Sequence, residues 1–265
     1  MKNKIFRIIC IAIALISFGY VFWYYYQMKR TKDDVSQLSK RVEAPISEHR
    51  VVPIEEAPPE KEGEEVDWTP EVLPEFEALL TKNQNIIGWI TINGTDINYP
   101  VMKSLVGNGS YYLNHNFDQQ EDKNGSLFMD DRCDVIKPTV NYIIYGHNMK
   151  SGAMFGNLDE YKKESYWRSH QTVTFNTIYD YGTYTVMAAF ESRVYRDNDI
   201  GFRYYDFIDP ADEVEFMTGV DNIKALAMYE TGVTAQWGDR LLLLSTCDYE
   251  EDNGRFVVVC KLTGY

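Results

Sequence analysis

A run of 19 uncharged residues, 8–26, constrains the fold of this chain more than any other feature. A helix of about 20 predominantly apolar residues crosses the hydrocarbon core of a bilayer. Five consecutive aromatic residues, 22–26, end the run, as in the aromatic belts at membrane interfaces. The run is long for the core of a signal peptide, and no small-x-small cleavage site follows it. We therefore expect residues 1–28 to form an uncleaved anchor.

Basic residues flank this apolar run on both sides, so the positive-inside rule does not decide its orientation. A short basic head before an N-terminal anchor usually leaves the long C-terminal part outside the cell. We therefore expect a single-pass protein of the cell membrane whose remaining chain is extracellular.

Residues 29–68 are predicted to form a stalk. Up to about residue 50 the pattern has weak helical character, and a segment rich in proline and glutamate follows. This segment is too charged and too poor in apolar residues to bury a core, which is typical of a solvated spacer. The formal net charge of −14 argues against nucleic acid as a partner, because binding phosphates requires a basic face.

Strand patterns dominate the predicted domain, 69–265. Two apolar runs, 86–92 and 97–102, flank Asn93-Gly94, which is a strong hairpin signal. Further predicted strands are 126–129, 139–145, 172–176, 184–194, 241–246 and 256–262.

Few helices interrupt these strands. A short helix is predicted at 74–80, and two more at 155–161 and at 210–217, where Asp209 is the expected N-cap. Successive strands with few helices between them predict a mostly antiparallel barrel or closed sheet with peripheral helices.

The four cysteines, Cys10, Cys133, Cys247 and Cys260, show neither C-x-x-C spacing nor a disulfide framework. The sequence also contains no metal cluster, P-loop or dinucleotide fingerprint. We therefore expect no metal or cofactor, and we expect one cysteine to be kept as a reactive thiol.

Cys247 ends an apolar run, and an acidic loop separates it from a second, β-branched run. If the loop is centred near Glu251, antiparallel pairing places Arg255 opposite Cys247 and Leu242 opposite Cys260. Directly opposed residues have Cβ atoms about 5 Å apart. A cation beside a thiol favours the thiolate, which is the nucleophile. Because Arg keeps its proton, it can donate to a substrate carbonyl or an oxyanion but cannot serve as a base.

A thiol that attacks an amide also needs a proton donor for the leaving amine, and histidine suits this task because it titrates near neutrality. His49 lies in the predicted stalk, His170 in a polar connection, and His115 is either structural or substrate-facing. His147 follows an apolar strand and Gly146, from which it can project into a cleft. We therefore expect His147 to be the catalytic partner of Cys247.

Three motifs, which follow one another along the chain in the order His, Ser-Thr-Cys and Arg, resemble those of the sortase family. Leu243-Leu244-Ser245-Thr246-Cys247, with Arg255 downstream, resembles the signature Thr-Leu-x-Thr-Cys, and residues 145–149 resemble the family's histidine motif. Residues 124–130 and a long insertion around 200–220 resemble class B sortases in particular. Leu243 departs from the usual Thr. It is expected to alter packing beneath the site and removes no catalytic group.

The resemblance implies an eight-stranded β-barrel and a cysteine transpeptidase. Cys247 would attack the carbonyl of Thr in the C-terminal sorting motif of a secreted surface protein and form a thioester. His147 would protonate the leaving amine, and Arg255 would hold the substrate carbonyl. An amine from a cell-wall precursor or a pilin would then resolve the thioester.

Ser245, Thr246 and Asp248 are the neighbours expected to touch the sorting peptide, although Ser245 and Thr246 have an alternative role in completing the strand. Two other functions stay open. One is a membrane-anchored cysteine hydrolase or non-sortase wall transpeptidase, which would not cleave a sorting peptide. The other is a non-enzymatic binding domain in which Cys247 is inert.

Overall fold

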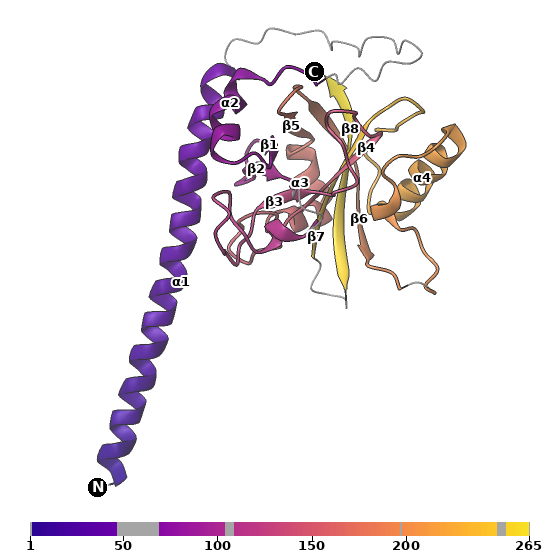
Figure 1. Cartoon of the computed structure of the whole chain (residues 1–265). Helices are drawn as coiled ribbons and strands as arrows, with labels where there is room; N and C mark the ends of the chain where they lie inside the picture. Colours follow the sequence, from indigo (N-terminus) through magenta and orange to yellow (C-terminus); the bar gives the residue numbers. More distant parts are fainter. Residues whose placement is uncertain (1, 47–68, 104–108, 197, 248–252, 265) are drawn as a thin grey trace.

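The structure is a computed structural model, and it describes residues 2–46, 69–103, 109–196, 198–247 and 253–264. One long helix, α1 (Lys2–Ile46), runs along one side of a β-rich domain and extends beyond it (Figure 1). The predicted anchor and the first part of the predicted stalk belong to this single helix. The rest of the predicted stalk, 47–68, lies outside the described residues.

Eight strands hydrogen-bond in a ring with the order β1-β2-β3-β4-β7-β8-β6-β5, and β5 pairs again with β1. Their bounds are β1 (Ile86–Thr91), β2 (Asn98–Met102), β3 (Leu127–Met129), β4 (Asn141–Tyr145), β5 (Thr172–Thr177), β6 (Thr183–Arg193), β7 (Leu241–Cys247) and β8 (Gly254–Gly264). The pairs β2–β3 and β4–β7 are parallel, and the other six are antiparallel. The mostly antiparallel closed sheet is therefore confirmed, and the two parallel pairs are an addition to it.

The apolar strands meet in the main core. All four leucines of β7, 241–244, are fully buried, as are 256–260 of β8. Burial on both faces explains why these strands are continuous apolar runs and do not alternate with polar residues. The strand that carries Cys247 is thus held rigidly up to its last residue, which is half-buried.

The helices surround the sheet. They are α2 (Pro74–Lys82), η1 (Tyr111–Leu113), η2 (Leu158–Lys162), α3 (Glu164–Ser169), η3 (Tyr204–Asp206) and α4 (Glu213–Leu226). The predicted helix at 155–161 is wrong in its bounds, because the helical residues begin at Leu158 and continue, after a break at Lys163, into α3.

The predicted cap of the last helix is also wrong. Asp212 caps α4 by accepting a hydrogen bond from the backbone N–H of Glu215 at 2.9 Å. Asp209 instead accepts from the backbone N–H of Val140 at 3.2 Å. Both carboxylates precede the same apolar pattern, so sequence alone favours either one.

The second half of α1 packs on the domain. Leu38 and Val42 are buried in a cluster with Phe76 and Leu79 of α2. Thr31 donates to Asp122 at 3.1 Å. Residues 31–42, which belong to the predicted stalk, therefore contact the domain. Within the described part of the chain, one helical segment, Lys4–Lys40, is long and apolar enough to span a membrane.

Candidate active site

The β7–β8 hairpin joins Cys247 to Arg255. The two residues are direct partners in the antiparallel register, and Leu242 is the partner of Cys260. Both predicted pairings are confirmed. Because directly opposed residues point to the same face of a sheet, the thiol and the guanidinium project to the same side of the ring.

Burial separates Cys247 from the other cysteines of the domain. Cys247 is half-buried, whereas Cys133 and Cys260 are fully buried. Burial raises the pKa of the Cys133 thiol to about 12, and it also raises the pKa of Cys260. A buried thiol that keeps its proton is a poor nucleophile. Cys247 is thus the accessible thiol of the domain.

A parallel pair of strands brings His147 to Cys247. Tyr145 of β4 is the partner of Ser245 of β7, and the N–H of Gly146 donates to the carbonyl of Ser245 at 3.1 Å. Two further steps along both strands lead to His147 and Cys247. A Cβ on Gly146 would lie 2.3 Å from the side chain of Leu127, so only glycine fits at this approach.

Two hydrogen bonds hold the segment that carries His147. The ring Nε2 of His147 lies 2.8 Å from the carbonyl oxygen of Leu113. A carbonyl only accepts, so Nε2 carries a proton, and proton exchange falls to Nδ1. The side-chain amide of Asn148 donates to the carbonyl of Cys247 at 2.9 Å, which ties the histidine loop to the nucleophile strand.

Arg255 bonds to its own hairpin, and its charge acts on a buried hydroxyl pair. Its Nη1 donates to the carbonyl of Gly254 at 2.8 Å. The hydroxyl groups of Tyr204 and Ser245 are 2.7 Å apart. Burial raises the pKa of Tyr204 to about 12, while the nearby charge of Arg255 acts in the opposite direction. Because Arg255 is the partner of Cys247, and Ser245 lies two positions before Cys247, all three residues lie on the same face of the hairpin.

Ser245 and Thr246 are buried, with 1% and 2% of their surface exposed. Ser245 bonds to Tyr204, and the Thr246 hydroxyl donates to the carbonyl of Gly146 at 2.8 Å. Both side chains therefore have partners within the protein. Asp248, the third predicted peptide contact, lies outside the described residues.

The other described histidines are held by their own helical turns. His115 stacks on Tyr111 with ring centroids 3.8 Å apart, and its Nδ1 lies 2.8 Å from the carbonyl of Tyr111. His170 makes the same i,i−4 contacts with Tyr166. His49 lies outside the described residues. Among the described histidines, His147 therefore best fits a catalytic role.

Sequence reasoning missed Tyr204 and Asn148, which contact β7 from 41 and 99 residues away. Asn148 directly follows His147, and that adjacency was the one signal available for it. Within the described residues, no group of three metal-ligating side chains comes together. A cavity of about 650 Å³ lies between α1 and residues 114–127, and Cys247, His147 and Arg255 do not line it.

The sortase domain family matches residues 90–263 of the chain. Sortase B of Staphylococcus aureus is 29% identical over 257 residues, covering 96% of this chain and 94% of that protein. Sortase B of Listeria monocytogenes is 32% identical, covering 72% of this chain and 75% of that protein. The structure of a Staphylococcus aureus sortase B–substrate complex has a TM-score of 0.73 at 27% identity, covering 90% and 98% of the two chains.

Proposed function

The chain belongs to the sortase family, with sortase B enzymes as its relatives, and on that premise we propose that Cys247, His147 and Arg255 are its catalytic residues. It acts as a class B transpeptidase on sorting-motif substrates. The direct pairing of Cys247 with Arg255, on the strand beside His147, is the observation that supports these roles best.

In the first step, the Cys247 thiolate attacks the carbonyl carbon of a Thr in the sorting motif. The guanidinium of Arg255 donates to the oxygen that becomes negative, where a fixed donor contributes most. The C–N bond then breaks, and His147, as imidazolium, protonates the leaving amine through Nδ1. The products are a thioester on Cys247 and a peptide with a free amine.

In the second step, an amine acceptor attacks the thioester carbonyl. His147, now neutral, takes the proton of the incoming amine, and the thiolate of Cys247 leaves. The acceptor is an amine of a cell-wall precursor or of a pilin. Water in place of the amine would give hydrolysis, so the acceptor decides between transfer and cleavage.

Ser245 and Thr246 of β7 and Asp248 after it border the sorting peptide in this proposal. The side chains of Ser245 and Thr246 are buried, and their hydrogen bonds hold in place the strand that borders the peptide. The apolar half of α1 forms the anchor, and the domain from residue 69 onward lies outside the cell. The 19 uncharged residues and the aromatic end of this helix support the anchor, and the short basic head before it supports a domain outside the cell.

The test incubates the full chain in detergent micelles with a library of sorting-motif peptides and several amines. We expect an amide product, together with a thioester adduct whose mass maps to Cys247. Cys247→Ala should abolish both while the protein stays folded. Arg255→Lys should lower kcat/KM about 10²-fold, because an ammonium does not replace a planar donor fork.

Two outcomes would contradict the proposal. Peptide turnover by Cys247→Ala would exclude the thiol as nucleophile. Cleavage that gives only hydrolysed peptide, whatever amine is added, would favour a cysteine hydrolase.

A further inference from the structure

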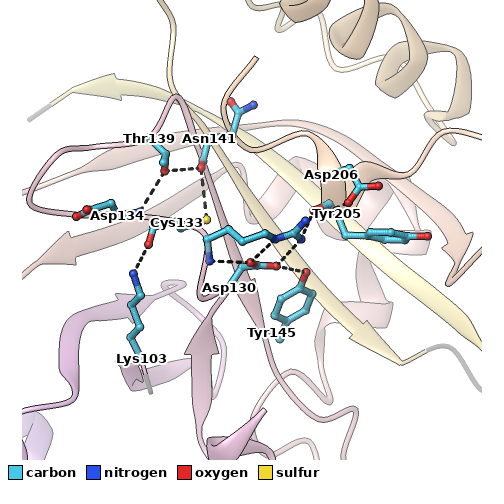
Figure 2. Close-up of polar contacts among 10 residues, drawn as sticks. Lys103, Asp130, Cys133, Asp134, Thr139, Asn141, Tyr145, Tyr205 and Asp206 are labelled. Atoms are coloured by element: carbon cyan, nitrogen blue, oxygen red, sulfur yellow. Dashed lines mark hydrogen bonds and ion pairs between the residues drawn. The ribbon is translucent and has the colours of Figure 1, made fainter. Parts of the chain in front are cut away.

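Arg132 joins the segment after β3 to the insertion before β7. Its Nε and Nη2 donate to the two oxygens of Asp130, both at 2.9 Å, in the parallel fork that Arg makes with a carboxylate. Its Nη1 donates to Asp206 at 3.0 Å, and Nη2 also donates to the carbonyl of Tyr205 at 2.6 Å. Figure 2 shows Asp130, Tyr145, Tyr205 and Asp206 gathered around this one guanidinium.

Asp130 is the buried half of this pair, with 7% of its surface exposed. It also accepts from the hydroxyl of Tyr145 at 2.9 Å. Burial by itself would raise the pKa of Asp130, but the hydrogen bonds from Arg132 and Tyr145 outweigh it and lower the pKa overall. Asp130 is therefore a fixed negative charge that orients the guanidinium of Arg132.

The network of Arg132 is linked to the residues that lie two positions before each catalytic candidate in the sequence. Tyr145, which bonds to Asp130, precedes His147 by two positions. Tyr204, the neighbour of Tyr205 in η3, bonds to Ser245, which precedes Cys247 by two positions. Because Tyr145 and Ser245 are partners in the β4–β7 register, the turn η3 is held beside the paired ends of these strands.

A second set of bonds holds the insertion without Arg132. The side-chain amide of Asn141 donates to the carbonyl of Phe207 at 3.0 Å, and its backbone N–H donates to the carbonyl of Ile208 at 2.8 Å. The Arg132–Asp206 pair is half exposed, so it contributes little to the free energy of unfolding. Loss of Arg132 therefore leaves the insertion attached, through these bonds and the Tyr204–Ser245 bond, but removes the contacts of Arg132 with Tyr205 and Asp206 in the turn at 202–206.

We propose that Arg132, oriented by Asp130, is a positioning residue for the sorting peptide, holding turn 202–206 as one side of the peptide site next to Cys247. This inference rests on the proposed function. In this inference, Arg132 and Asp130 affect the affinity for the peptide, and the thiol chemistry belongs to Cys247, His147 and Arg255.

The test measures kcat and KM on the full chain in detergent micelles. The substrate is the fluorogenic library peptide that the wild-type chain turns over fastest. Asp206→Ala removes one of the two contacts of Arg132 with the insertion and leaves its bond to the carbonyl of Tyr205. The double variant Asp130→Asn/Arg132→Met removes the buried charge together with its partner. Arg132→Lys keeps the charge but not the fork. Arg168→Met, in the exposed pair with Glu164 on α3, is the matched control.

We expect KM to rise about tenfold in the double variant and in Arg132→Lys, and about threefold in Asp206→Ala. The value of kcat and the rate of Cys247 alkylation by iodoacetamide should stay within about twofold of wild type. The control should change neither KM nor kcat. A purely structural role would not produce this separation of KM from kcat and alkylation.

Three results would overturn the inference. An unchanged KM in variants whose thermal stability falls would make the pair structural only. A parallel loss of kcat and alkylation rate would place its effect on the thiol. A wild-type chain that turns over no library peptide would refute the proposed function and this inference with it, whereas an unchanged KM in active variants refutes the inference alone.

Discussion

Burial gives the three cysteines of the domain different chemistry. Cys133 and Cys260 are fully buried with raised pKa values, and Cys247 is half-buried at a strand end. We expect iodoacetamide at pH 7 to modify Cys247 within minutes and the two buried thiols only after unfolding. Mass spectrometry of tryptic peptides from a Cys10→Ser chain checks this, because Cys10 is exposed in α1. Labelling of Cys247 only in denaturant would favour the inert binding domain.

Leu243 stands where the related signature has Thr, and it is fully buried between Ile143 of β4 and Val259 of β8. Leu243→Thr removes apolar volume and buries a hydroxyl, so we expect a loss of about 2 to 4 kcal/mol in the free energy of unfolding. Activity per folded molecule should change less than threefold. Denaturant titration and active-site titration measure the two effects separately. A stable variant with altered kcat would instead assign Leu243 a role in the chemistry.

At the scale of elements, local sequence patterns predicted how strands that follow one another in the sequence pair. The apolar runs around the acidic loop predicted the pairing of Cys247 with Arg255, because a hairpin's register follows from its loop. The parallel pairing of β4 with β7 could not be predicted in this way. About 95 residues separate these strands, and nothing in either run specifies a partner so distant.

The same limit applied to the residues that hold the catalytic candidates in place. His147 was found because it follows an apolar strand and Gly146. The contact of Tyr204 with Ser245 depends on where the insertion folds back, which packing decides. Residues 124–130 and the insertion around 200–220 were both recognised as motifs. Their connection through Arg132 became visible only in three dimensions.

The cap of α4 gives a prediction at this scale. Asp212→Ala removes the acceptor for the N–H of Glu215, so we expect a loss of about 1 kcal/mol in the free energy of unfolding. Asp221→Ala, at an exposed position within α4, should change it by less than about 0.5 kcal/mol. Denaturant titration compares the two variants. Equal effects would mean that removal of an acidic side chain, and not loss of the cap, accounts for the change.

At the scale of the whole molecule, the docking of α1 determines which way the site faces. The helix runs toward its N-terminus in the same direction as the carboxyl end of β7 points (Figure 1). Lys123 of the domain lies 4.0 Å from the ring centroid of Tyr24, within the aromatic end of the proposed anchor. In the proposed topology, with α1 in a bilayer, the active-site end of the ring faces the membrane (Figure 1).

The docking has a direct test. Leu38 lies 8% exposed against the cluster that holds Phe76 and Leu79, whereas its neighbour Gln37 is exposed. Leu38→Asp loses the apolar burial and places a charge in that cluster, so we expect the domain to lose at least about 2 kcal/mol in the free energy of unfolding. Gln37→Asp introduces the same charge on the solvent side and should change it by less than about 0.5 kcal/mol.

Denaturant titration of both variants in detergent micelles, followed by tryptophan fluorescence, measures this difference. Equal stabilities would mean that α1 leaves the domain surface in solution, and the domain would then move freely on its stalk. The expected difference means instead that a soluble version of the enzyme should begin before Thr31 and not at residue 69. A start at residue 69 removes Leu38 and Val42, which cover the apolar cluster around α2.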